Sequence, residues 1–359
     1  MQELARQSSA LIQNQTHAFA QIIVTRLYKL QPAEWARFGG VQYEKSVRDS
    51  VSHLHFLAQA LAVGSPQLFS EYVGWCKILF DALGFGPNAV PDIFRCTRQV
   101  LAECLPGQVA EPALAYIDRA LDALDTKTEP PQIVLTPDAP HADLATRYFE
   151  ALLIQDHNRA RQLVLDAARA GVPIQELYLH VLQVSQREIG RRWHLNQLNV
   201  AQEHYMTAVT QITMAQLYPY LFAAAPTVKH GTVVVACVPG EPHELGARML
   251  ADFFEMDGWN SYFLGANTPT AGVIEMMRRT RATLLCLSVT TALNIGQLSD
   301  AIALLRIHSD MKDTRVLVGG YLFNRVPDLW QLVGADAFAP DAEAGLRIAR
   351  ALVAKDTLP

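Results

Sequence analysis

Apolar residues recur at helical spacing through roughly the first 125 residues. One such run places Val73, Cys76, Leu79, Phe80 and Leu83 on one side of a helix. Glycine and proline breaks interrupt the pattern at Gly39-Gly40, Gly64 to Pro66 and Gly84 to Pro87, and such breaks separate helices. The pattern predicts an all-α N-terminal domain over residues 1–125.

A linker and a second helical region follow. Residues 126–140 hold four prolines and little apolar periodicity, which is typical of a domain boundary. Helical periodicity then resumes over residues 141–226. Pro173 is suited to open a helix that runs to Trp193, and another helix is expected from near Asn199 to Leu217. Four helices of this length are expected over the region, which predicts a four-helix bundle.

The pattern changes again at Lys229, and residues 227–359 alternate short apolar runs with helical stretches. This alternation predicts an α/β domain with a parallel, doubly wound, Rossmann-like sheet. Ligands of such sheets bind beyond the carboxyl ends of the strands, which directs attention to loops 239–246, 288–291 and 319–321. The expected strands are 232–238, 260–264, 283–289, 315–318 and 337–339.

Composition narrows the possible functions. The chain has 359 residues, a net charge of −5 and no cluster of lysines and arginines, so we expect neither nucleic acid nor membrane as a partner. No apolar run approaches the ~20 residues that cross a bilayer, and the polar N-terminus lacks a signal core. We therefore expect a cytoplasmic protein. The five cysteines are scattered, which argues against a disulfide framework or a zinc site.

The three loops carry residues suited to a large cofactor. His243 can present its imidazole to a metal, and Glu241 can hold the other ring nitrogen. Gly246 permits a close approach to the backbone. The remaining candidates are the hydroxyl side chains of Ser288 and Thr290 and the side-chain-free pair Gly319-Gly320.

The spacing of these loops resembles the signature of the cobalamin-binding domain of methionine synthase and the corrinoid mutases. That signature consists of Asp-x-His-x-x-Gly, Ser-x-Leu and Gly-Gly, in this order and at characteristic separations. In this sequence, the interval from Gly246 to Ser288 and the interval from Thr290 to Gly319 both match those separations. The resemblance covers about residues 228–355.

This resemblance implies that His243 is the lower cobalt ligand and displaces the cofactor's dimethylbenzimidazole base. By the same resemblance, Ser288 and Thr290 line the pocket for the tail, and Gly319 and Gly320 border it. Glu241 replaces the usual Asp and Thr290 the usual Leu, so whether Glu241 reaches His243 stays open. The alternative is a doubly wound domain in which His243 is an ordinary residue at a helix start.

A second motif lies in the predicted bundle, where nine residues separate Trp193 from Glu203-His204. It is similar to the motif of the adenosylcobalamin photoreceptors typified by the light-responsive repressor of carotenoid synthesis. The resemblance implies that Trp193 covers the adenosyl group and Glu203 holds its ribose hydroxyls, with His204 close by. His194 matches the residue that binds cobalt from the upper face after light. Alternatively, Trp193 is core and the others are surface residues.

The N-terminal domain lacks a basic recognition helix and is too long for a helix-turn-helix unit. A helical domain ahead of a cobalamin light sensor resembles the photocobilins, in which a globin-like domain binds a bilin such as biliverdin. A dimerisation or signalling bundle is the alternative. The candidate bilin-binding residues are His53, His55, Tyr72, Trp75, Arg95 and Arg98.

Three functions compete. The first is a light-sensing photoreceptor that binds adenosylcobalamin and is not an enzyme. The second is a corrinoid carrier subunit of a methyltransferase system, and the third is a sensor of redox state or cobalamin level that works in the dark. Because no further domain follows residue 359, we expect the signal to leave through a homo-oligomer, dimer or tetramer, that changes with light, or through an unknown downstream partner.

Overall fold

The computed structural model describes residues 2–32, 40–127, 130–221 and 230–354. The chain divides into two compact units, which are described separately: the first consists mainly of residues 1–130 and the second mainly of residues 131–359. Gly39 and the expected boundary at residues 226–227 lie outside the described residues. Within the described ranges, no helix combines the length and apolar character that a membrane crossing requires.

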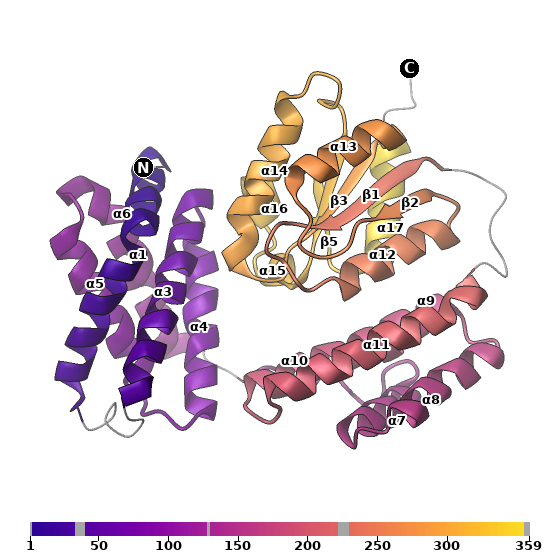
Figure 1. The fold of residues 1–359 in the computed structure, drawn as a ribbon, viewed down its shortest axis with the longest axis horizontal. Coiled ribbons are helices and arrows are strands. Elements are labelled where there is room, and N and C mark those ends of the chain that lie inside the picture. The colour runs from indigo at the N-terminus through magenta and orange to yellow at the C-terminus, as the bar shows by residue number, and fades with distance from the viewer. Residues whose placement is uncertain (1, 33–39, 128–129, 222–229, 355–359) are drawn as a thin grey trace. The chain divides into compact units, whose positions relative to one another are not determined.

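The first unit is helical, and its helices begin and end near the predicted breaks. At the start of helix α4 (Pro66–Ala82), the Ser65 side chain accepts a hydrogen bond from the backbone N–H of Leu68 at 3.3 Å, and Pro66 occupies the first helical position. Gly84 follows the end of this helix and has a φ of 79°. The helices are α1 (Gln2–Leu30), α3 (Gly40–Val63), α4 (Pro66–Ala82), α5 (Ala89–Cys104) and α6 (Gly107–Lys127) (Figure 1).

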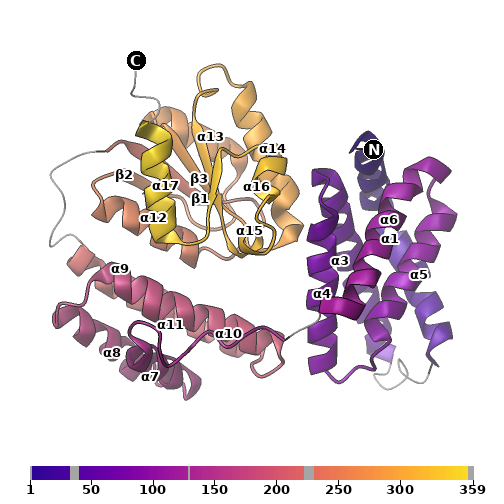
Figure 2. The same cartoon turned by 180° about the vertical axis from the view of Figure 1, so that it is seen from behind.

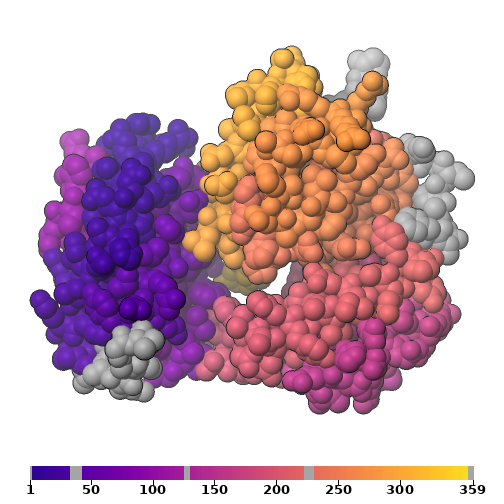
Figure 3. Space-filling view, in the orientation of Figure 1, coloured from indigo at the N-terminus to yellow at the C-terminus, as the bar shows by residue number. Residues whose placement is uncertain are grey.

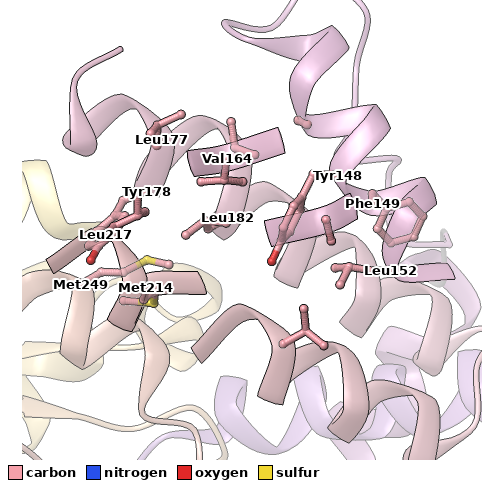
Figure 4. Close-up of a cluster of buried hydrophobic side chains, with 14 of the residues drawn as sticks. Tyr148, Phe149, Leu152, Val164, Leu177, Tyr178, Leu182, Met214, Leu217 and Met249 are labelled. Atoms are coloured by element: carbon pink, nitrogen blue, oxygen red, sulfur yellow. The ribbon is translucent and has the colours of Figure 1, made fainter. Parts of the chain in front are cut away.

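The second unit begins with the predicted bundle. Pro173 precedes a long helical run, as expected, but the run contains a π-helical turn over Tyr178–Gln183 that the pattern did not predict. Buried side chains of all the bundle helices form one core, around Tyr148, Leu182 and Leu217 (Figure 4). The helices are α7 (Ala142–Leu153), α8 (His157–Arg169), α9 (Ile174–Leu177), α10 (Val184–His194) and α11 (Val200–Leu221).

The α/β domain contains a five-stranded parallel sheet in the order β2-β1-β3-β4-β5. Helices α12 (Leu245–Met256) and α17 (Ala342–Ala354) cover one face, and α13 (Thr270–Thr280) and α14 (Ile295–Ile307) cover the other (Figures 1 and 2). The strands are β1 (Thr232–Cys237), β2 (Asn260–Phe263), β3 (Leu284–Ser288), β4 (Arg315–Gly319) and β5 (Ala337–Ala339), and the short helices α15 (Tyr321–Arg325) and α16 (Leu329–Leu332) follow β4. The predicted fold class is confirmed.

Helix α12 joins the bundle to the α/β domain. Its residues Met249 and Phe253 belong to the apolar core of the bundle, as the position of Met249 in Figure 4 illustrates. Three carboxylates of this segment accept hydrogen bonds from bundle side chains. These bonds are Tyr178 to Asp252 (2.8 Å), Gln211 to Glu244 (3.1 Å) and Tyr218 to Glu255 (3.0 Å). Figure 3 shows a hollow beside this contact, between the α/β domain and the bundle.

Candidate functional site

The loop between β1 and α12 holds His243 in a defined orientation. Glu241 is fully buried, and its Oε1 accepts hydrogen bonds from Nδ1 of His243 at 2.5 Å and from the His243 backbone N–H at 3.1 Å. The His243 side chain is 53% exposed, so its second ring nitrogen, Nε2, is left for another partner. The longer Glu at this position therefore reaches His243, which the sequence left open.

Glu241 also fastens this loop to the next one. Its Oε2 accepts a hydrogen bond from the backbone N–H of Thr290 at 2.8 Å. Burial alone raises the pKa of Glu241, but the hydrogen bonds from His243 and Thr290 outweigh burial and leave the pKa below its ordinary value. The hydrogen bond between the two side chains raises the pKa of His243, although the partial burial of His243 acts to lower it. The carboxylate is thus charged and holds Nδ1 protonated, which leaves Nε2 as the ring nitrogen that could coordinate a metal.

The loops after β3 and β4 lie next to each other at the same edge of the sheet. Ser288 pairs with Gly319 in the strand register, and Val289 donates its N–H to the Gly319 carbonyl at 3.0 Å. Gly320 has a φ of 105°, and a Cβ placed there would lie 2.1 Å from the Val289 carbonyl oxygen. Only glycine fits at this position.

The residues expected to line the cofactor therefore lie in loops that meet at one edge of the sheet. Ser288 is buried at the end of β3, and no atom lies within 4 Å of a Cβ built on Gly246. A narrow apolar crevice also opens beside the sheet, between Leu285 and Leu287 of β3 and helices α13 and α14. The half-exposed imidazole, which a buried carboxylate orients, suits the face of a corrinoid. The glycine backbone and the apolar crevice suit its tail.

The bundle supplies the other group of predicted residues. Trp193 packs partly against the bundle core, and His194 is buried at the end of α10. The Glu203 carboxylate lies near enough to His243 to contribute to the rise in its pKa. His204 is 75% exposed, 3.4 Å from Glu203. The structure thus brings Glu203 toward His243, whereas His194 faces into the protein.

The sequence did not single out Glu188, which stabilises the end of α10. This carboxylate is 1% exposed and accepts hydrogen bonds from Arg191 at 2.7 Å and from Arg192 at 2.9 Å. The backbone N–H of Val134, in the predicted linker, lies 3.4 Å from it. Glu188 therefore anchors the linker to the helix that carries Trp193 and His194. A Glu three and four residues before two arginines was the only signal for it.

The N-terminal domain brings three of the six proposed bilin residues together. His53 is buried, with Nδ1 2.7 Å from the Tyr72 hydroxyl and a ring contact to Phe94. The Trp75 ring lies parallel to the Tyr72 ring, and Phe56 also stacks on the Tyr72 ring. Nε2 of His53 is buried and has no hydrogen-bond partner among the described residues. Burial lowers the pKa of His53 to about 4.

The other three bilin candidates are placed differently. His55 is half-buried and, two positions from His53 on a helix, points to a different side. Arg95 forms an ion pair with Asp92, and Arg98 donates two hydrogen bonds to Asp118. Both guanidinium groups therefore already have carboxylate partners, so they offer less to the propionates of a bilin than the sequence suggested.

Comparisons with known proteins agree with this geometry. Residues 231–349 match the family model of the B12 binding domain, and residues 144–218 match a second model with the same description. The dimethylamine corrinoid protein 3 of Methanosarcina acetivorans is 25% identical over 198 residues, which are 54% of this chain and 91% of that protein. The HTH-type transcriptional repressor CarH of Myxococcus xanthus is 31% identical over 143 residues, 40% of this chain and 46% of the repressor.

The match to CarH spans less than half the length of that repressor. Among solved structures, the monomethylamine corrinoid protein of Methanosarcina barkeri aligns with a TM-score of 0.54 at 18% identity, over 59% of this chain and all of that one. At this identity the likeness concerns the fold alone. Together, the two family matches and the relatives support a cobalamin-binding region within residues 144–349.

Proposed function

We propose that this chain is a light sensor that binds adenosylcobalamin, with His243 as the lower axial ligand. The observation that carries the proposal is the buried Glu241 carboxylate, which fixes the His243 ring and leaves Nε2 for cobalt. Adenosylcobalamin supplies, when bound, a cobalt–carbon bond that light breaks. Ser288, Thr290, Gly319, Gly320 and Gly246 line the lower face and the tail.

On the upper face, the chain contributes an aromatic ring and a carboxylate. Trp193 offers an apolar surface to the adenine, and Glu203 offers oxygens to ribose hydroxyls, with His204 beside it. We propose His194 as the upper ligand after illumination. Because His194 is buried, this role requires its side chain to leave its present site or α10 to shift.

The lower-ligand role is tested with His243→Ala. We expect the wild-type protein to bind cobalamin with the benzimidazole base displaced and an imidazole in its place, and the variant to lose that spectrum. An unchanged spectrum and affinity in the variant would show that His243 is not the ligand.

A corrinoid carrier for methyl transfer is the second candidate. The specific observation in its favour is that the match covers 91% of the dimethylamine corrinoid protein 3. Absorption spectra of the purified holoprotein before and after green light separate the two. A change that persists in the dark, and that His194→Ala alters, supports the sensor. A spectrum indifferent to light supports the carrier or a sensor that works in the dark.

We further propose that the N-terminal domain takes up a bilin such as biliverdin beside His53, Tyr72 and Trp75. Within the described part of the chain, Nε2 of His53 is buried without a hydrogen-bond partner in an aromatic cluster, which supports this role. Adding biliverdin to the apoprotein should give a defined, red-shifted band that His53→Gln weakens. Free-pigment absorbance alone would leave the domain as a signalling or dimerisation bundle.

The proposed output is a change of quaternary structure. Light scattering on dark and illuminated holoprotein, over a wide range of concentrations, should give different masses. Equal masses and hydrodynamic radii in both states would instead place the signal in an internal rearrangement read by another protein.

A further inference from the structure

A chain of hydrogen bonds runs through the bundle and ends at the Glu203 carboxylate. Thr207, one turn after Glu203 on α11, has its hydroxyl 2.9 Å from Oε1 of that carboxylate. The same hydroxyl lies 3.1 Å from Oε1 of Gln186 on α10, and Nε2 of Gln186 donates to Oγ1 of Thr210 at 2.7 Å. The Thr210 hydroxyl also lies 2.9 Å from that of Tyr148, in the bundle core that Figure 4 shows. The chain thus joins α7, α10 and α11.

The buried end of this chain fixes the orientation of the Gln186 amide. Thr210 is fully buried and donates its single hydroxyl hydrogen to the backbone carbonyl of Met206 at 3.0 Å. Its hydroxyl oxygen is therefore the acceptor for both Tyr148 and Gln186. The amide nitrogen of Gln186 must face Thr210 to donate to it, so the amide oxygen faces Thr207.

The other end of the chain has more acceptors than donors. Oε1 of Gln186 and Oε1 of Glu203 lie 3.1 and 2.9 Å from the Thr207 hydroxyl, which has one hydrogen to donate. The two oxygens therefore compete for that hydrogen. A ligand hydroxyl that donates to Glu203 releases the hydrogen of Thr207 for Gln186, and both acceptors are then satisfied. The arrangement favours a ligand that brings a hydroxyl group.

One side of α11 connects these residues to the His243 loop. Glu203, Thr207 and Gln211 follow one another at intervals of four residues, so they lie on the same side of the helix. Gln211 donates to the carboxylate of Glu244, the neighbour of His243, at 3.1 Å. The negative charge of Glu203 also contributes to the raised pKa of His243. The side of α11 that carries Glu203 is thus the side turned toward the proposed lower ligand.

We propose that Gln186 and Thr207 are positioning residues that act through Glu203 and select a cobalamin whose upper ligand carries hydroxyl groups. Thr207 holds the carboxylate in place. Gln186 takes over the hydrogen of Thr207 when a ribose hydroxyl donates to Glu203. This inference rests on the proposed function, since it requires cobalamin at His243 with its upper ligand beside Glu203. It adds to that function two residues that favour adenosylcobalamin over methylcobalamin.

The test compares the affinities of the full chain for adenosylcobalamin and methylcobalamin, which differ only in the upper ligand. Both are measured by spectral titration in the dark for wild type, Glu203→Ala, Thr207→Val, Thr207→Ser and Gln186→Leu. We expect Thr207→Val and Gln186→Leu each to shift the ratio of the two affinities toward methylcobalamin by about three- to tenfold. Thr207→Ser keeps the hydroxyl and should keep the wild-type ratio. Thr213→Val is the matched control, because Thr213 lies on the same helix but donates to the Val209 carbonyl, at 2.8 Å.

The outcomes separate this inference from the proposed function. A wild-type protein that binds no cobalamin, or a Glu203→Ala variant that keeps the wild-type ratio, overturns the proposed function at this face and the inference with it. If Glu203→Ala changes the ratio while Thr207→Val and Gln186→Leu keep it, the inference alone is overturned. An equal loss of affinity for both cobalamins would show a merely structural role and also overturns it. In the Glu203→Ala background, Thr207→Val should change the ratio no further, because the two residues act as one unit.

Discussion

The bond between Glu241 and His243 gives the sharpest prediction. Glu241→Gln keeps the size of the side chain but removes its charge and one acceptor oxygen. In the wild-type protein the two oxygens accept three hydrogen bonds, two from His243 and one from the backbone of Thr290. A glutamine amide oriented to serve His243 turns its NH₂ group toward the N–H of Thr290, and two donors then face each other.

The expected magnitude follows from these contacts. One charge-assisted hydrogen bond is lost in a fully buried place, which costs about 1.5–3 kcal/mol of stability, and the two bonds to His243 weaken because the acceptor becomes neutral. Changing the partner that orients a metal-ligating histidine typically lowers metal affinity about 10–100-fold. We expect Glu241→Gln to weaken cobalamin binding within that range.

The assay is a titration of the apoprotein with cobalamin in the dark, read from the absorption spectrum, together with a thermal melt. Glu244→Gln is the matched control, because Glu244 also accepts a backbone hydrogen bond, from Ala266 at 2.9 Å, yet makes no hydrogen bond to His243. The control should lower stability but keep the imidazole-ligated spectrum. The reasoning is refuted if Glu241→Gln binds cobalamin like wild type while Glu244→Gln does not.

Three further changes have definite expected outcomes. Gly320→Ala forces a Cβ against the Val289 carbonyl and should lower stability by more than about 2 kcal/mol in a melt, whereas Gly246→Ala, with open space around it, should keep stability and weaken only cobalamin binding. Burial raises the pKa of Asp252 from 3.8 to about 6. The contribution of its protonation to stability is therefore fully present below pH 3.8 and is lost as the pH rises through 6. Asp252→Asn should stabilise the protein at pH 7.5 by up to roughly 3 kcal/mol and lose this advantage near pH 4. Burial lowers the pKa of His53 from 6.5 to about 4. The protein should therefore lose roughly 3 kcal/mol of stability as the pH falls from 6.5 toward 4. Thermal melts of His53→Phe should show a smaller loss of stability over the same pH range.

The sequence predicted that the three strand-end loops meet because a parallel sheet converts spacing into position. Strands of fixed rise in register must end together, so loops that lie far apart in the sequence meet at one edge. The five strands were predicted to within two residues at either end. Only the reach of Glu241 was open, because it depends on a side-chain conformation rather than on periodicity.

Residues whose role depends on how elements pack were harder to predict. His194 follows Trp193 in a helical motif, yet the packing of α10 buries it, and the π-helical turn upstream shifts the face that each later residue presents. Arg95 and Arg98 were chosen for their charge, but Asp92 of the same helix pairs with Arg95, and Asp118 of α6 pairs with Arg98. Helical periodicity indicates which face is apolar without naming the partner that it meets.

The way α12 is shared constrains how the bundle can respond to the cofactor. Met249 and Phe253 insert from α12 into the bundle core, and each is about 2% exposed. Lifting the bundle away exposes both side chains, at about 1.5–3 kcal/mol each, and breaks the hydrogen bonds from Tyr178, Gln211 and Tyr218. A sliding motion along α12 can keep the apolar contact while it exchanges these hydrogen bonds. A light response that moves α10 is therefore more favourable as a shift of the bundle across α12 than as an opening of the second unit.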